Sequence, residues 1–108
     1  MKKLFFGLLV AAWLGLVFGS SAVGKVKNNS PILIGSVLPL TGDLAVFGEM
    51  QKNAYHLALK HLNEAGGVKG RKLEVLIEDD KGKQDNARSA VERLISSDHI
   101  VVLTGGYT

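Results

Sequence analysis

The chain has 108 residues, the size of one small domain or of part of a larger one. It contains no cysteine, so disulfides, thiolate metal sites, cysteine nucleophiles and a lipid-modified cysteine behind a leader are all excluded. The formal net charge is +3, but without Lys2 and Lys3 eleven basic residues face ten acidic ones, and the two signs are interspersed. No basic field is left to bind phosphates, and this argues against a nucleic-acid-binding protein.

The first 24 residues have the pattern of a secretory signal peptide. Lys2 and Lys3 form a basic start, residues 4–18 are apolar apart from glycines, and small residues follow. The small side chains predict cleavage after Ala22 or Gly24. The alternative is an uncleaved anchor, since about 20 uncharged residues can just span a bilayer, but the strongly apolar part is shorter than that. We therefore expect an exported protein that meets the membrane only through this segment, followed by a polar tether over residues 25–30.

The first half of the remaining chain predicts a strand and then a helix. Residues 32–40 form a nearly continuous apolar run, which is typical of a central strand in a parallel sheet. From about residue 48 to residue 65 the apolar residues recur at helical spacing. The predicted inner face of this helix consists of Met50, Ala54, Leu57, Ala58, His61 and Leu62. Gly66 and Gly67 predict its end, because glycine readily adopts the left-handed conformation that caps a helix.

The second half predicts two further strands and another helix. Residues 72–79 alternate between apolar and charged side chains, which indicates a strand with one better-buried face, at an edge of the sheet. Residues 84–96 predict a helix, and residues 100–103 a third strand. The apolar stripe of this helix consists of Ala87, Ala90, Val91, Leu94 and Ile95.

This β-α-β-α-β order with short connections predicts an α/β fold: a partial doubly wound parallel sheet with helices on both faces. The strand at residues 32–40 is expected in the middle, between the other two. The strand at residues 100–103 then lies at an open edge, although it is apolar on both faces, and edge strands are normally charged or covered. The sequence also stops inside a glycine loop. We therefore expect these residues to be the opening of a longer protein.

Motifs for nucleotide, metal or catalytic chemistry are weak. The glycines at 42 and 48 do not have the spacing of a dinucleotide or phosphate loop. Residues 78–80 (Glu-Asp-Asp) alternate in direction along a strand, so we expect them to solvate the strand end and to accept hydrogen bonds from the following loop. His56 and His61 are misaligned on a helix, and no nucleophile, base and orienting group occur together. The sequence predicts no enzyme, no cofactor and no metal site.

Ligands of open α/β sheets bind at the carboxyl ends of the strands. Two predicted loops leave those ends, residues 39–48 and 104–108. Phe47 supplies an aromatic surface in the first loop, and Tyr107 and Thr108 close the second, where we expect free backbone amides at Gly105 and Gly106. Such a set suits a small zwitterion or carboxylate. The alternative is that Phe47 packs under the first helix and the glycines only turn the chain.

These residues also carry a resemblance to a known family. The chain after residue 30 is similar to type I periplasmic solute-binding proteins of the leucine/isoleucine/valine-binding kind. The similar segments are residues 34–42 (IGSVLPLTG), Phe47-Gly48, residues 63–73 (NEAGGVKGRKL), Asp79-Asp80 and the helix with Ala87 and Ala90. By this resemblance, residues 31–108 are the incomplete N-terminal part of a leucine-binding-protein-like domain, the first part of lobe one.

The resemblance implies a periplasmic protein whose two lobes close on a small molecule and deliver it to an ABC permease in the inner membrane. It implies that Phe47 lies over the ligand, that the Thr108 hydroxyl holds a ligand carboxylate, and that Tyr107 lines the pocket through its main chain. Branched-chain amino acids are the first candidates, and amides, urea and aromatic acids stay open. The alternatives are a ligand-sensing receptor domain on the same fold, an enzyme on a related scaffold, or a fragment without independent function.

Overall fold

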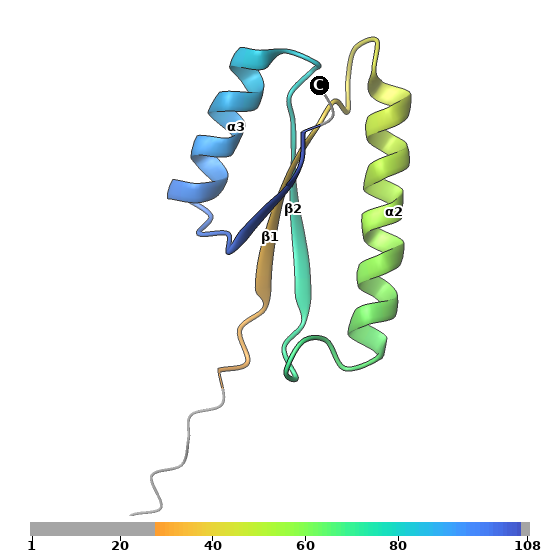
Figure 1. Cartoon of the computed structure of the whole chain (residues 1–108), viewed down its shortest axis with the longest axis vertical. Coiled ribbons are helices and arrows are strands. Elements are labelled where there is room, and N and C mark those ends of the chain that lie inside the picture. Colours follow the sequence, from red (N-terminus) through yellow and green to blue (C-terminus); the bar gives the residue numbers. More distant parts are fainter. Residues whose placement is uncertain (1–27, 107–108) are drawn as a thin grey trace, which may run out of the picture.

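The computed structural model describes residues 28–106, which form three strands and two helices (Figure 1). Their order is β1 (Ile32–Leu38), α2 (Ala45–Glu64), β2 (Leu73–Asp79), α3 (Gln84–Ser96) and β3 (Val102–Gly105). The strands form one parallel sheet in the order β2-β1-β3, and the two helices cover opposite faces of it. The predicted α/β fold, with the first strand in the middle and the second at an edge, is confirmed. The predicted signal peptide and its cleavage site lie outside the described residues.

β1 is the strand to which the other two are added. It pairs with β2 along its whole length and with β3 from Ile34 to Val37. The third strand was expected at residues 100–103 and lies two residues later. The backbone amide of Val101 donates to Leu33 at 3.0 Å before the strand begins, and the Ile100 side chain lies against Gly35 in the core. The apolar character of Ile100 therefore reflects its contact with β1 from the connection between α3 and β3, outside the strand.

The core lies between the sheet and α3. Ala90 and Leu94 of this helix are almost fully buried against Val37 of β1. The side chains packed around them are Leu76, Ala87, Val91 and Ile100. The predicted stripe of α3 is thus confirmed, except at Ile95, whose side chain is 57% exposed.

α2 is present as predicted, but the prediction of its inner face is wrong. Met50 and Leu57 are 64% and 57% exposed, whereas Tyr55 and Asn63 face the sheet and bond to residues of β3 and β2. The rotation of the helix is set by Gly48, which is buried against the loop after β1. A Cβ there would overlap the Pro39 carbonyl group. The helix can therefore approach the loop this closely only because residue 48 has no side chain.

The end of α2 is tied to the start of β2. Gly66 and Gly67 have φ angles of +107° and +70°, and the amide of Gly67 donates to the Leu62 carbonyl at 2.8 Å. The predicted glycine end of the helix is confirmed. The Asn63 side chain exchanges two hydrogen bonds with the backbone of Leu73, at 2.8 and 2.9 Å, and so fixes the connection.

β3 forms an exposed apolar edge. Val101, Val102 and Leu103 are 69%, 50% and 44% exposed, in agreement with the prediction of an open apolar edge. Between β3 and α2 lies an apolar groove of about 300 Å³, lined among others by Ile34, Leu62 and Val102. Within residues 28–106, neither helix is long and apolar enough to cross a membrane.

We expect Gly48→Ala to lower the free energy of unfolding by about 2–3 kcal/mol, because the methyl group must displace backbone that cannot yield without moving the loop. This corresponds to a fall in Tm of roughly 8 °C or more. Asn53→Ala, at an exposed position of the same helix, is the matched control and should be neutral or slightly stabilising. Thermal unfolding followed by circular dichroism measures both. Equal Tm values for the two variants would contradict the proposed close approach.

We expect the chain to self-associate at micromolar concentrations through the open β3 edge, because unpaired strand edges with apolar side chains add to one another. Val102→Lys should shift the sedimentation profile towards the monomer. Ile95→Lys removes a similarly exposed apolar side chain from α3, away from the edge, and should have a smaller effect. If both variants behave alike, association depends on general hydrophobicity and not on the strand edge.

Candidate functional site

The parallel pairing brings the carboxyl ends of all three strands to one edge of the sheet. Leu38 pairs with Asp79 and Val37 with Gly105, so the residues after each strand are neighbours. Figure 1 shows the loop between β1 and α2 and the loop between β2 and α3 at this same end. This is the edge at which open α/β sheets bind ligands, and it is the edge that the sequence predicted.

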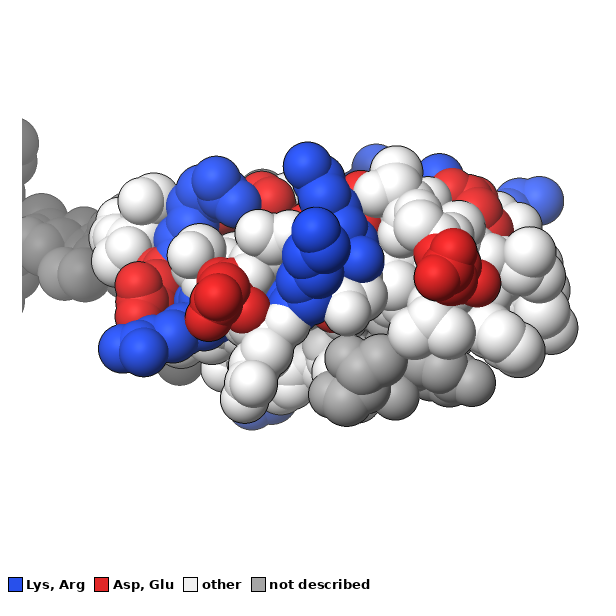
Figure 2. Space-filling view, turned by 90° about the horizontal axis from the view of Figure 1, so that it is seen from above, with Lys and Arg blue, Asp and Glu red and all other residues white. Residues whose placement is uncertain are grey.

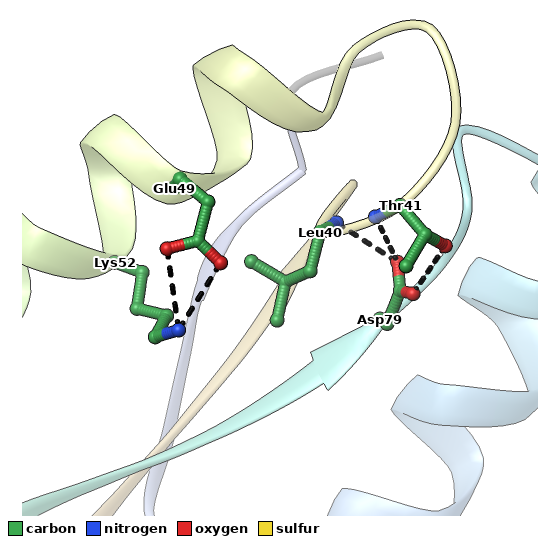
Figure 3. Close-up of polar contacts among 5 residues, drawn as sticks. All are labelled: Leu40, Thr41, Glu49, Lys52 and Asp79. Atoms are coloured by element: carbon green, nitrogen blue, oxygen red, sulfur yellow. Dashed lines mark hydrogen bonds and ion pairs between the residues drawn. The ribbon is translucent and has the colours of Figure 1, made fainter.

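The Asp79 carboxylate organises two of these loops (Figure 3). Its Oδ1 accepts hydrogen bonds from the backbone amides of Leu40 at 2.8 Å, Thr41 at 3.3 Å and Lys81 at 2.8 Å. Its Oδ2 accepts a hydrogen bond from the Thr41 hydroxyl at 2.6 Å. One side chain at the end of β2 therefore holds the loop that leaves β1 and the loop that leaves β2.

These contacts also set the ionisation of Asp79. Partial burial raises the pKa of the carboxyl group, but the hydrogen bonds from the Thr41 hydroxyl and from the amides of Lys81, Leu40 and Thr41 outweigh it. The pKa of Asp79 is therefore below its ordinary value of 3.8. The carboxylate is ionised at neutral pH, which is the form that accepts all four hydrogen bonds.

The expectation for residues 78–80 is confirmed in part. Asp79 and Asp80 accept hydrogen bonds from the following loop, through Lys81 and Gly82. The bonds from Leu40 and Thr41 were not expected, since these residues are nearly forty positions away. The sequence did contain a signal for these bonds: a carboxylate ends one predicted strand, and a Thr-Gly turn follows the neighbouring strand. Glu78 points elsewhere and pairs with Arg93 of α3 at 2.9 Å.

Phe47 lies at the predicted edge, but in a helix and not in a loop. α2 begins at Ala45, three residues earlier than predicted, so Phe47 belongs to its first turn. Its amide donates to the Leu44 carbonyl at 3.0 Å, and its side chain is 45% exposed. The next turn carries an ion pair between Glu49 and Lys52 at 3.1 Å (Figure 3).

The end of β3 differs from the prediction in one respect. The amide of Gly106 donates to the Val37 carbonyl at 3.2 Å, so the expectation that this amide is free is wrong. Gly105 has a φ angle of +93°, and a Cβ there would lie 2.7 Å from the Ser36 hydroxyl. The predicted ligand-binding residues Tyr107 and Thr108 lie outside the described residues, directly beyond this point.

A small hollow of about 100 Å³ opens beside the end of β3, on the face covered by α3. The buried residue Asp80 and the backbone from Leu103 to Gly106 line one side, and Ala87 and Val91 line the other. This space is large enough for several water molecules. Ser36 is fully buried nearby, and its hydroxyl has no hydrogen-bond partner among residues 28–106.

The described residues contain no group of three histidine or acidic side chains that could hold a metal ion. His56, His61 and His99 are all exposed, and His56 and His61 lie five residues apart on α2. Figure 2 shows acidic and basic side chains interleaved on the face seen from above, where no field of one sign is visible. The arrangement at the strand ends offers noncovalent contacts, namely an aromatic ring and loops fixed by hydrogen bonds.

Comparison with known proteins identifies the family. Residues 31–108 match the sequence pattern described as periplasmic binding protein. The chain belongs to the periplasmic binding protein family. It is 34% identical over 101 residues to the Leu/Ile/Val-binding protein homolog 8 of Brucella suis, a match that covers 94% of this chain and 24% of that protein. The chain thus spans about a quarter of the length of the curated relatives it matches.

Similarity to solved structures supports the same family. The branched-chain amino acid transporter substrate-binding protein LivJ of Streptococcus pneumoniae, in complex with isoleucine, superimposes with a TM-score of 0.68 at 29% identity. The match covers 70% of this chain and 22% of LivJ. A solute-binding protein of an ABC transporter from Rhodopseudomonas palustris, in complex with 3,4-dihydroxybenzoic acid, gives 0.61 at 31% identity, covering 69% of this chain and 20% of that one. The resemblance drawn from the sequence is confirmed, as part of a type I periplasmic-binding fold.

We expect Asp79→Asn to lower the free energy of unfolding by about 1–2 kcal/mol at pH 7, because an amide cannot accept all four hydrogen bonds. Since the folded-state pKa is below 3.8, the stabilisation is complete above about pH 5 and is lost as the pH falls through the folded pKa. Urea unfolding at pH 7 and in steps to pH 2 measures the difference between wild type and variant. The difference should shrink as the pH falls through the folded pKa.

Glu78→Gln is the control, because it removes a neighbouring carboxylate that pairs with Arg93 at the surface. It should cost less than about 1 kcal/mol at pH 7. A pH-independent difference between wild type and Asp79→Asn would contradict the ionised acceptor.

Proposed function

We propose that this chain supplies part of the ligand site of an ABC importer's solute-binding component, which captures amino acids, with branched-chain side chains first, or similar small polar solutes. The observation that carries the proposal is the family match over residues 31–108, together with the position of Phe47 at the carboxyl edge of the sheet. The named functions of the similar proteins, Leu/Ile/Val binding and isoleucine binding, support the ligand class. The chain acts by noncovalent capture, without catalysis, and the partner is an ABC permease.

In this proposal Phe47 covers the apolar part of the ligand, the Thr108 hydroxyl binds its carboxylate, and Tyr107 lines the pocket through its main chain. Capture requires closure of two lobes on the ligand. Shifting an open-to-closed balance from 1:99 to 99:1 needs about 5.5 kcal/mol in favour of the closed form. The contacts at one edge of one sheet do not supply this, so the 108-residue chain alone should bind leucine weakly, well above the micromolar range.

A chimaera tests the ligand class. Residues 31–108 replace the structurally matched segment of the Streptococcus pneumoniae LivJ protein, whose structure contains isoleucine. We expect the chimaera to bind isoleucine within about tenfold of LivJ itself, and Phe47→Ala to weaken binding by a further tenfold or more, since a buried aromatic contact is worth about 1.4 kcal/mol or more. Isothermal titration calorimetry measures both affinities.

Val46→Ala is the control, since Val46 is 69% exposed and precedes Phe47 in the same helix. It should leave the affinity unchanged, and Phe47→Tyr should retain most of it. A folded chimaera that binds neither isoleucine, leucine nor valine would reject the ligand class. Equal effects of Val46→Ala and Phe47→Ala would reject Phe47 as a contact.

We further propose that residues 1–24 direct export to the periplasm and are removed. Expression in a Gram-negative host should yield a mature chain that starts at Val23 or Lys25, as measured by the intact mass of the periplasmic fraction. Leu9→Arg places a charge in the apolar segment and should retain the unprocessed chain in the cytoplasm. Asn29→Arg adds the same charge outside the segment and is the control. An unprocessed chain held in the membrane would indicate an anchor.

A further inference from the structure

The loop between β1 and α2 is held from two sides. On one side, the amides of Leu40 and Thr41 and the Thr41 hydroxyl bond to Asp79. On the other side, Pro39 lies directly against Gly48, where a Cβ would be 2.6 Å from the Pro39 carbonyl carbon. The loop therefore cannot shift away from Asp79 without also shifting the first turn of α2.

Phe47 is the residue immediately before Gly48. A short series of contacts thus runs from the Asp79 carboxylate through the backbone of residues 39–41 to Gly48, and so to Phe47. These contacts are made through space, so the link between Asp79 and Phe47 does not require the loop between Thr41 and Phe47 to be stiff. Because backbone groups in van der Waals contact cannot interpenetrate, a displacement at Leu40 is passed on to the helix start.

The loop between β2 and α3 belongs to the same assembly. The Lys81 amide donates to the same oxygen of Asp79 as the Leu40 amide does, at 2.8 Å. A Cβ at Gly42 would lie 3.4 Å from the Lys81 carbonyl oxygen, and a Cβ at Gly82 would lie 3.7 Å from Leu44, so the two loops lie close together at two further points. Loss of the carboxylate would loosen both loops together.

We propose that Asp79 is the positioning residue of the ligand site: by holding the β1–α2 loop, it fixes the Phe47 ring at the carboxyl edge of the sheet before a ligand arrives. Asp79 makes no ligand contact in this role. The inference rests on the proposed function for its consequence in binding, because an aromatic contact that is already in place spares the ligand the cost of ordering it. The positioning itself is a property of the unliganded chain.

The competing explanation is that Asp79 only adds stability. In that case its removal lowers Tm but leaves the environment of Phe47 unchanged at temperatures where the chain is folded. A measurement on Phe47 itself separates the two explanations. Tm alone does not, since both predict a decrease.

The first experiment uses the 108-residue chain labelled with 4-fluorophenylalanine. Besides Phe47, the sequence has phenylalanines only at positions 5, 6 and 18, so Phe47→Leu assigns the Phe47 signal in the fluorine NMR spectrum. We expect Asp79→Asn to shift and broaden this signal well below the Tm of the variant. We also expect the amides of Leu40 and Thr41 to exchange hydrogen about tenfold faster or more.

Glu78→Gln is the matched control, because it removes a carboxylate one residue earlier whose partner is on α3, and it should leave the Phe47 signal in place. Thr41→Val removes only the hydroxyl bond and should shift the signal in the same direction by less, whereas Thr41→Ser keeps the hydroxyl and should restore it. This pair decides the question if Asp79→Asn does not fold. An unchanged Phe47 signal in Asp79→Asn, or in Thr41→Val when that pair decides, overturns the proposal.

The second experiment adds leucine, isoleucine or valine at millimolar concentration to the same labelled chain. Movement of the wild-type Phe47 signal supports the site, and Asp79→Asn should then need about tenfold more ligand for the same movement. If the ligand moves both signals equally at equal concentrations, Asp79 is not a positioning residue. If no ligand moves the wild-type signal, this chain alone does not capture the ligand, and the ligand-free comparison of Asp79→Asn with Glu78→Gln still decides the inference.

Discussion

The parallel pairing of β1 with both of its neighbours is the constraint on which the described structure depends. β1 pairs with β2 over seven residues and with β3 over four, and it is buried between the two helices along its second half. Because all three strands run in the same direction, everything that follows their ends is gathered at one edge. The acidic end of β2, the turn after β1 and the glycines at the end of β3 meet there for this reason.

The two faces of the sheet are packed differently. On the α3 side, Ala90 and Leu94 close a small core against β1. On the α2 side the only buried helix residue is Gly48, and much of the apolar surface of the helix is exposed. Part of the apolar surface of α2 therefore packs on the sheet. Another part lines the groove between α2 and β3, which is open within residues 28–106. Hydrophobic burial therefore holds α3 firmly on the sheet, whereas α2 is held mainly by a few separate contacts.

Most of the contacts that hold α2 and the loop before it are polar. Asn63 fixes the end of α2 to β2, the Tyr55 hydroxyl lies 3.3 Å from that of Thr104 on β3, and Asp79 fixes the loop before the helix. Hydrogen bonds to an ionised carboxylate are among the stronger ones in proteins and depend on direction. Such bonds can fix a loop that is accessible to solvent and so cannot be fixed by burial.

The order of elements, the central place of β1, the bounds of α3 and the family were determined by the sequence, since apolar periodicity, capping glycines and short motifs are local properties. The rotation of α2, the two-residue displacement of β3 and the partners of Asp79 were decided only by the tertiary structure. Met50 and Leu57 have the right period for an inner face, but the contact of Gly48 with Pro39 turns that face outward. Asp79 and Thr41 are adjacent only because β1 and β2 pair in register. Such contacts join segments that are distant in the chain, and local patterns carry no information about which distant surfaces can approach closely enough to touch.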